Sequence, residues 1–421
     1  MAEKTNSILL TLVAALLLFS NSTMAQSGKC GEQRNVMVKA LDELTWKQLN
    51  AIYEDVGEEN YDEAYEDLLK MVRRAGKNEY LQAVMYQALA QVEWSRENYD
   101  ESLKYFETAV ELDTLPDQTH FALMYQIAQL YFMKDRYQDS LDALDLWFCK
   151  VPAETVTSHA YVLRASINVQ KADYREALKA IETAIAMESE PKENWYQLKL
   201  AAHFELEQYA EAAATLEIMI TRWPDNKSYW LQLAQIYYKL GQEDRSLAVM
   251  AMAYRKSLLD KQSDITYLSS LYSNANVPYK AAEVLEKGIQ DGIVEPSKSH
   301  WTMVAETWYG AEELQKSLAA FRQAGKAAED GDIDLRRGFI LVDLEDWQEA
   351  LGALDAALRK GGLNERRTGE AYLLRGMAQF NLQNFDAASA DWGRAARYES
   401  TRDAARQWIN HLREERLRRA S

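Results

Sequence analysis

The sequence predicts an all-α fold, a right-handed superhelical solenoid built from repeated helix pairs. The 421 residues include only 6 Pro and 17 Gly, too few for a chain of many short strands and tight turns. One short phrase returns every 34 to 38 residues, which is the length of a helix–turn–helix unit. Aromatic residues make up 11% of the chain, so there is enough apolar material for a long continuous core.

The charge of the chain limits its partners. The formal net charge is −17 at pH 7. A nucleic-acid-binding protein needs a basic face that displaces counterions from phosphates, so we expect no nucleic-acid partner. Binding to anionic lipid is disfavoured for the same reason.

The first 25 residues resemble a secretory signal peptide. Residues 8–19 form one apolar run, too short to cross a bilayer of about 30 Å as a helix. Thr23 and Ala25 then fit the small-x-small pattern of a signal peptidase site, which predicts cleavage after Ala25. We therefore expect an exported protein, in a bacterium a periplasmic one, with no integral membrane span after cleavage. The alternative is an uncleaved membrane anchor.

Two cysteines suit an oxidising compartment. Cys30 lies just inside the predicted mature N-terminus, and Cys149 follows Trp147 and Phe148. An even count favours one disulfide, and an extended arm of about 15 residues reaches roughly 50 Å, far enough to fold back. The alternative is two unpaired thiols, with Cys149 buried as a small apolar residue. No CxxC or clustered His accompanies either cysteine, so we expect no metal site.

The repeated phrase sets the register of the solenoid. It occurs at residues 60–64 (NYDEA), 98–102 (NYDES), 136–140 (RYQDS), 173–177 (DYREA), 208–212 (QYAEA), 346–350 (DWQEA) and 384–388 (NFDAA). This register predicts about ten units that start near residues 45, 83, 121, 158, 193, 227, 262, 298, 331 and 369. Residues 26–44 would form an N-terminal arm, 45–400 the solenoid and 401–421 a C-terminal capping helix.

Within each unit the residue types resemble the tetratricopeptide (TPR) repeat. The unit starting at 227 has large residues at positions 4, 11 and 24 (Trp230, Tyr237, Met250) and small ones at positions 8 and 20 (Ala234, Ser246). The small residues allow two antiparallel helices to approach closely, and the large ones fill the remaining space. One helix pair cannot bury its apolar face alone, so the units stack.

No motif in the chain points to catalysis. The sequence has no HExxH, GxSxG, P-loop or dinucleotide-binding pattern, and its five His lie in different units. An acidic cluster over residues 54–67 lacks the pattern of a calcium loop and is expected to be a solvated face. We therefore expect no catalytic residue, no cofactor and no enzyme activity. An enzyme with an unrecognised site is the alternative.

The TPR resemblance implies a partner-binding groove lined by the first helix of each unit. Aromatic and amide side chains recur at its lining positions, a combination that suits an extended peptide. The candidate residues are Gln87, Gln91, Trp94, Tyr125, Gln129, Phe132, Gln197, Phe204, Gln235, Tyr238 and Tyr309. The aromatic members would alternatively pack in the core. Lys239 is the basic residue expected on this face, so a clamp for a partner's C-terminal carboxylate is not predicted.

A narrower resemblance suggests a cellular process in which the protein takes part. A signal peptide, an early cysteine, about ten TPR units, the string Trp147-Phe148-Cys149 and residues 277–281 (VPYKA) resemble exported TPR proteins associated with TonB systems. That resemblance implies a non-enzymatic accessory component of outer-membrane uptake of iron complexes, with TonB, ExbB or ExbD as partners. The alternative is a TPR scaffold for envelope assembly or peptidoglycan synthesis.

Overall fold

The structure is a computed structural model that describes residues 34, 36 and 39–420. Within these residues all regular structure is helical, and the chain divides into two compact units, residues 1–208 and 209–421. The predicted signal peptide, residues 1–25, and Cys30 lie outside the described residues, as does most of the predicted arm. The cleavage site and the boundaries of the arm therefore stay predictions.

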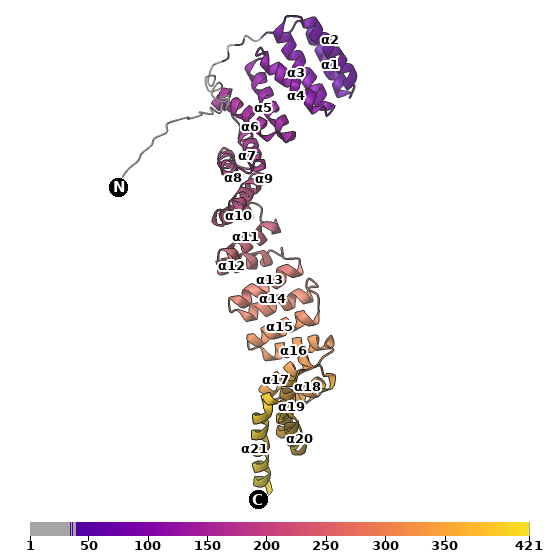
Figure 1. Cartoon of the computed structure of the whole chain (residues 1–421), viewed down its shortest axis with the longest axis vertical. Helices are drawn as coiled ribbons and strands as arrows, with labels where there is room; N and C mark the ends of the chain where they lie inside the picture. Colours follow the sequence, from indigo (N-terminus) through magenta and orange to yellow (C-terminus); the bar gives the residue numbers. More distant parts are fainter. Residues whose placement is uncertain (1–33, 35, 37–38, 421) are drawn as a thin grey trace, which may run out of the picture. The chain divides into compact units, whose positions relative to one another are not determined.

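In the first unit, helices of similar length follow one another as antiparallel neighbours (Figure 1). They are α1 (Glu43–Gly57), α2 (Tyr61–Ala75), α3 (Glu79–Ser95), α4 (Tyr99–Glu111), α5 (Asp117–Met133), α6 (Tyr137–Lys150), α7 (Ser158–Gln170), α8 (Tyr174–Ala186) and α9 (Glu193–Glu205). A short 3₁₀ helix, η2 (Ala153–Thr155), lies between α6 and α7.

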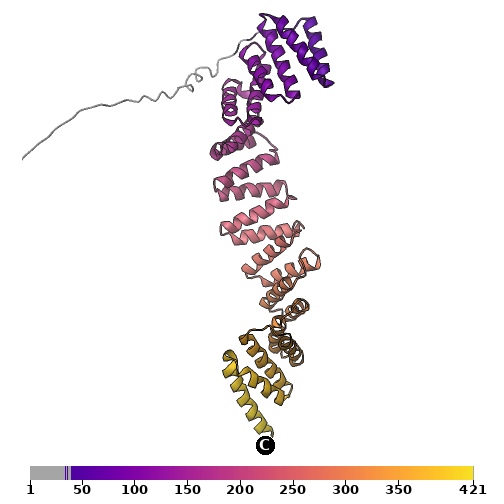
Figure 2. The same cartoon turned by 45° about the vertical axis from the view of Figure 1, so that its right-hand side comes forward.

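The second unit continues the same alternation, and Figure 2 shows its helices stacked in succession. They are α10 (Tyr209–Arg222), α11 (Lys227–Lys239), α12 (Glu243–Arg255), α13 (Gln262–Asn274), α14 (Pro278–Gln290), α15 (Lys298–Gly310), α16 (Leu314–Lys326), α17 (Asp332–Asp343), α18 (Trp347–Lys360), α19 (Glu365–Asn381), α20 (Phe385–Ala395), η3 (Glu399–Thr401) and α21 (Arg402–Ala420).

The predicted helical repeat fold with a closing C-terminal helix is confirmed. The unit starts predicted at residues 158, 193, 227, 262 and 298 coincide with the first residues of α7, α9, α11, α13 and α15. In the closing helix α21, Leu412 is buried, Trp408 and Ile409 are half-buried, and Arg413 is exposed.

Ten turns of one kind link each first helix to the helix that follows it. In each turn one residue has a left-handed backbone, with φ between 55° and 70°. These residues are Glu59, Glu97, Asp135, Ala172, Glu207, Gly241, Asn276, Glu312, Glu345 and Gln383. The next residue donates its N–H to a carbonyl near the end of the first helix, as Asn98 does to Glu93 at 2.8 Å. This satisfies a carbonyl that the helix leaves open.

In four of the pairs a hydrogen bond joins positions 8 and 20 of the repeat. The buried Ser102 hydroxyl donates to the Ala90 carbonyl at 2.7 Å, and Ser140 donates to Ala128 at 2.6 Å. Ser317 repeats this contact with Ala305 at 2.8 Å, while in the α13–α14 pair Ser269 at position 8 donates to Ala281 at position 20 at 2.9 Å. Such a short path between two helix backbones leaves no room for a large side chain.

The α19–α20 pair shows the same constraint in its tightest form. Gly376 occupies position 8, and Trp392, which is fully buried, occupies position 24. A Cβ atom on Gly376 would lie 2.4 Å from Nε1 of Trp392. The indole is held in place because its N–H donates to the Leu373 carbonyl at 3.1 Å.

We therefore expect Gly376→Ala to lower the free energy of unfolding by about 1–3 kcal/mol, because the rigid indole cannot move away from the new methyl group. The matched control is Gly352→Ala in α18, where a Cβ meets nothing within 4 Å. That change should stabilise the protein by about 0.5–1 kcal/mol through helix propensity. Urea unfolding followed by circular dichroism measures both, and equal effects of the two changes would contradict this account.

Arg34 attaches the described start of the N-terminal arm to the first unit. Its side chain is only 9% exposed, and its guanidinium pairs with Asp113 at 2.8 Å and with Asp117 at 2.7 Å. It also donates to the Leu115 carbonyl at 3.0 Å and lies 5.8 Å from the ring centre of Phe121. A charge buried this far is held by its two carboxylates and one carbonyl together.

The position of Arg34 is relevant to the predicted disulfide. Phe121, which Arg34 covers, accepts a hydrogen bond at its carbonyl from Trp147 Nε1 at 2.9 Å. Trp147 lies two residues before Cys149 on α6. The arm therefore contacts the part of α5 that packs against the cysteine-bearing end of α6. Cys30 is outside the described residues, so the Cys30–Cys149 bridge stays a prediction.

His120 is buried beside Arg34. Its side chain is 2% exposed, its Nδ1 lies 3.6 Å from Asp113, and neither ring nitrogen has a hydrogen-bond partner among the described residues. Burial, followed by the charge of Arg34, lowers the pKa of His120 to about 4. The folded protein therefore holds this imidazole neutral.

This neutral histidine predicts a loss of stability in mild acid. An unfolded histidine has a pKa of about 6.5, so below that pH the unfolded chain takes up a proton that the folded chain does not. Stability should fall progressively from about pH 6.5 to about pH 4, by up to about 3 kcal/mol. Thermal unfolding of His120→Gln between these limits should show a shallower pH dependence than the unchanged protein, while the exposed His159→Gln should match it.

Candidate partner-binding face

The predicted groove residues all lie on the first helices of the pairs. We call the exposed and half-buried side chains of the first helices the first-helix face: α1, α3, α5, α7 and α9 in the first unit, and α11, α13, α15, α17 and α19 in the second. None of the eleven predicted residues is fully buried. Gln91, Gln197, Gln235, Tyr238 and Tyr309 are exposed, whereas Gln87, Trp94, Tyr125, Gln129, Phe132 and Phe204 are half-buried.

Trp94, Phe132 and Tyr238 occupy position 12 of their units. The exposure of such an aromatic side chain depends on the residue that the following helix places against it. Trp94 packs edge-on against Tyr99, five residues later, with ring centres 5.6 Å apart, and Phe132 packs on Tyr137 at 5.8 Å. The residue five positions after Tyr238 is Glu243. Tyr238 is accordingly 47% exposed.

A first pocket lies in the first unit. It has a volume of 530 Å³ and is lined by Asp117, Gln118, Phe121, Ala122, Tyr125, Trp147, Val151, Pro152, Thr155 and Thr157. Of the predicted residues it includes only Tyr125, whose ring packs 5.3 Å from that of Trp147 and whose hydroxyl donates to the His159 carbonyl at 3.2 Å. Tyr125 is therefore partly structural.

A second pocket, of 250 Å³, lies in the second unit between neighbouring pairs. Tyr309 of α15, Phe321 of α16, and Phe339 and Ile340 of α17 form its apolar walls. Its polar lining is Glu306, Arg336 and Asp343. Tyr309 is 48% exposed and Phe339 is 40% exposed, so two aromatic rings are available to a ligand at the opening. We call this the Tyr309 pocket.

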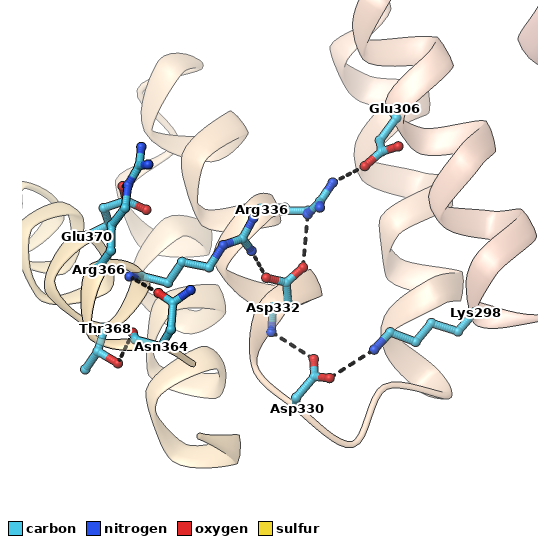
Figure 3. A network of polar contacts seen from close by, with 10 residues as sticks. Lys298, Glu306, Asp330, Asp332, Arg336, Asn364, Arg366, Thr368 and Glu370 are labelled. Carbon is cyan, nitrogen blue, oxygen red and sulfur yellow. Dashed lines mark hydrogen bonds and ion pairs between the residues drawn. The ribbon is translucent and has the colours of Figure 1, made fainter. Parts of the chain in front are cut away.

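A charged network borders the Tyr309 pocket (Figure 3). Arg336 pairs with Glu306 of α15 and, at 3.1 Å, with Asp332. Asp332 also pairs with Arg367 of α19, so the network links the first helices of three successive pairs. On its other side Lys298 pairs with Asp330 at 3.1 Å.

The charged side chains of the pocket differ in whether they form ion pairs. The carboxylates of Glu306 and Asp332 balance the charge of Arg336, since both pair with it. Asp343, at the end of α17, is exposed and forms no ion pair with any described residue. The pocket therefore offers apolar walls and one unpaired carboxylate.

Two residues of this pocket, Phe339 and Arg336, are not among the binding residues predicted from the sequence. Phe339 occupies position 9 of the unit that starts near 331, a lining position, but that unit departs from the repeat pattern elsewhere. Arg336 adds a basic residue to the face on which Lys239 is expected. Because two carboxylates neutralise Arg336, the expectation that this face does not clamp a partner's carboxylate stands as a prediction.

No group of His, Cys, Asp and Glu in the described part of the chain is arranged to hold a metal ion. Among the described helices, none combines the length and the apolar character that a membrane span requires.

The exposure of Tyr238 and Tyr309 predicts that the double change to Ala leaves the fold intact. Each ring is about half in water, so we expect each change to cost less than about 1 kcal/mol of unfolding free energy. The control is the neighbouring residue Tyr237, which is 2% exposed and whose hydroxyl donates to Glu217 at 2.5 Å. Tyr237→Ala should cost about 3–5 kcal/mol. Urea unfolding compares them, and a large loss in the double variant would assign Tyr238 and Tyr309 to the core.

Comparison with known proteins agrees with this geometry. Two family models, both described as tetratricopeptide repeat, match residues 88–147, 198–257 and 335–406 in one case and residues 158–191 in the other. No curated protein matches the sequence.

Several solved structures are similar to the chain. A tetratricopeptide repeat protein from Parabacteroides merdae is 14% identical over 68% of this chain and 94% of its own, with a TM-score of 0.39. The C-terminal part of a TPR repeat-containing protein from Cytophaga hutchinsonii is 13% identical, covering 67% and 97%, with a TM-score of 0.36. The TPR2AB domain of yeast Sti1, in a complex with pHSP90, is 15% identical, covering 61% and 96%, with a TM-score of 0.32. Since the repeat models together match more than half of the residues, the chain belongs to the tetratricopeptide repeat family.

Proposed function

We propose that this protein is an exported interaction protein that holds an extended segment of a partner on its first-helix face, as an accessory component of TonB-dependent transport. Tetratricopeptide repeats are scaffolds for protein–protein interaction. The observation that carries the binding role is the Tyr309 pocket, where two exposed aromatic rings and an unpaired carboxylate meet.

The size of the pocket favours a side chain over a cofactor. Pockets for drug-sized ligands span about 300–1,000 Å³, and this one has 250 Å³. Its walls suit one large apolar side chain of a partner segment, which would rest between Tyr309 and Phe339.

The charge of the pocket favours a basic neighbour for that side chain. Asp343 has no ion-pair partner among the described residues, and the whole chain carries a net charge of −17. A Lys or Arg next to the apolar anchor would pair with Asp343 and would also be favoured by the faces of the exposed rings. The partner segment is therefore an apolar residue flanked by a basic one.

The proposed location of the protein and the identity of its partner are inferred from the sequence. The N-terminal resemblance to a signal peptide favours the periplasm, and the narrower family resemblance favours TonB, ExbB or ExbD as the partner. Both are proposals about residues and proteins that the described structure does not include.

Site-specific photo-crosslinking in intact, iron-starved cells tests the proposal. A photoreactive phenylalanine replaces Tyr309 in one strain and Met252 in another. Met252 lies on a second helix, α12, and is 50% exposed, close to the 48% of Tyr309. We expect TonB, ExbB or ExbD to be captured at position 309 and not at position 252.

The other outcomes separate the parts of the proposal. Capture of envelope-assembly or peptidoglycan-synthesis proteins at position 309 alone would keep the binding face and replace the TonB setting with the alternative scaffold function. Equal capture at both positions, or none at 309, would show that the first-helix face does not bind the partner.

A further inference from the structure

The two most exposed large apolar side chains of the described residues lie on the first and last helices. Leu44 on α1 and Leu417 on α21 are each 67% exposed. Of the described elements, α1 packs on α2, and α21 packs on α19, α20 and η3. Each of these helices therefore presents an outer face that, in the inner pairs, a neighbouring helix would cover.

The outer face of α1 is an acidic stripe that begins with a leucine. Leu44, Lys47, Ala51, Glu54 and Glu58 recur at helical spacing, and all five are exposed. Lys47 is paired with Glu43 at 2.7 Å, so it adds little positive charge. At 1.5 Å per residue, Glu54 and Glu58 lie about 15 and 21 Å from Leu44 along the helix axis.

The outer face of α21 carries the opposite charge and also ends with a leucine. Arg402, Arg406, Asn410, Arg413 and Leu417 recur at helical spacing and are all exposed. Arg402 and Arg406 form no ion pair with any described residue. They lie about 22 and 16 Å from Leu417 along the axis, by the same rise per residue.

The two stripes match when the helices run antiparallel. If the two leucines meet at one end, both glutamates of α1 fall within about 2 Å of the level of the two arginines of α21. Antiparallel packing is also the arrangement of neighbouring helices inside each unit. In this register Lys47 is level with Arg413, and Glu43, which pairs with Lys47, offsets this like charge.

We propose that the outer face of α1 binds the outer face of α21 of a second copy of this chain, so that copies associate head to tail. Charge complementarity identifies a second copy as the partner of this face. The outer face of α21 has unpaired arginines, and the outer face of α1 has carboxylates at the matching spacing. Such a contact joins two different surfaces and therefore produces open chains or closed rings rather than a symmetric dimer.

Sedimentation velocity of the purified whole protein tests the proposal, from about 1 to about 200 µM protein and at about 0.05 and 0.5 M salt. We expect larger species at high protein concentration and low salt. Two single-end variants follow: Glu54→Lys with Glu58→Lys, and Arg402→Glu with Arg406→Glu. Each should weaken self-association by about tenfold or more, because like charges then face each other.

Mixing gives the decisive result. In a 1:1 mixture of the two variants every contact again joins opposite charges, so assembly should return. The helix dipole favours Arg402→Glu at the first residue of α21 and Glu58→Lys directly after the last residue of α1, so we expect both variants to fold. Circular dichroism checks this.

The matched control reverses two exposed cations elsewhere, Arg175→Glu with Lys256→Glu, the same change in net charge as in the α21 variant, and should assemble like the unchanged protein. A protein that stays monomeric at every concentration would overturn the proposal. So would assembly that the single-end variants do not weaken, or a mixture that remains monomeric, because the contact would then involve other surfaces.

Discussion

The close approach of the two helices in each pair is the constraint on which the rest of this structure depends. Position 8 and position 20 are both small and buried in eight of the ten pairs, and in four of these a serine at one position donates its hydroxyl to the backbone carbonyl of the other. The hydroxyl uses a spare acceptor site of a carbonyl that is already in the helix ladder, so no buried polar group is left open. With this distance fixed, larger side chains must point between pairs, and the pairs stack. Because the pairs share this geometry, the same side of each first helix is exposed to solvent.

The repeat is readable from sequence because this constraint acts on residue type at fixed spacing. Five helix starts follow from it to the residue, but α3, α5 and α19 begin four residues earlier than the repeat register predicts. In α3 and α19 the extra turn begins at an asparagine cap. The Asn78 side chain accepts from the N–H of Leu81 at 3.2 Å, and Asn364 accepts from Arg367 at 2.9 Å. Such caps satisfy the open N–H groups of a helix start and depend on one residue outside the repeat pattern.

The binding face was less predictable because exposure there depends on neighbours that the repeat does not specify. Position 12 is on the correct helix in every unit, yet Trp94 is covered by an aromatic five residues later and Tyr309 is not. Phe339 belongs to a unit whose pattern is weak, so spacing alone does not single it out. The ion pair that offsets the charge of Arg336 is made by Glu306, thirty residues away on another helix. Pairings of this kind follow from tertiary structure and leave no local signal in the sequence.

Charged side chains have different roles in different parts of the chain. They distinguish the Tyr309 pocket, which has an unpaired carboxylate, from the outer face of α21, which has unpaired arginines. Within the second unit, Lys227 is bound by Asp264 at 3.0 Å, and Arg375 by Asp391 at 2.6 Å, so these cations contribute to packing and not to the outer field. Arg402 and Arg406 of α21, in contrast, are exposed and form no ion pair with any described residue. A pocket of 250 Å³ anchors one side chain and, by itself, supports only weak binding. Copies joined head to tail would present the Tyr309 pocket repeatedly to one partner, and repeated weak contacts gain in affinity when their spacing permits them to engage together. Association through α1 and α21 leaves the Tyr309 pocket free, so partner binding and assembly would strengthen each other.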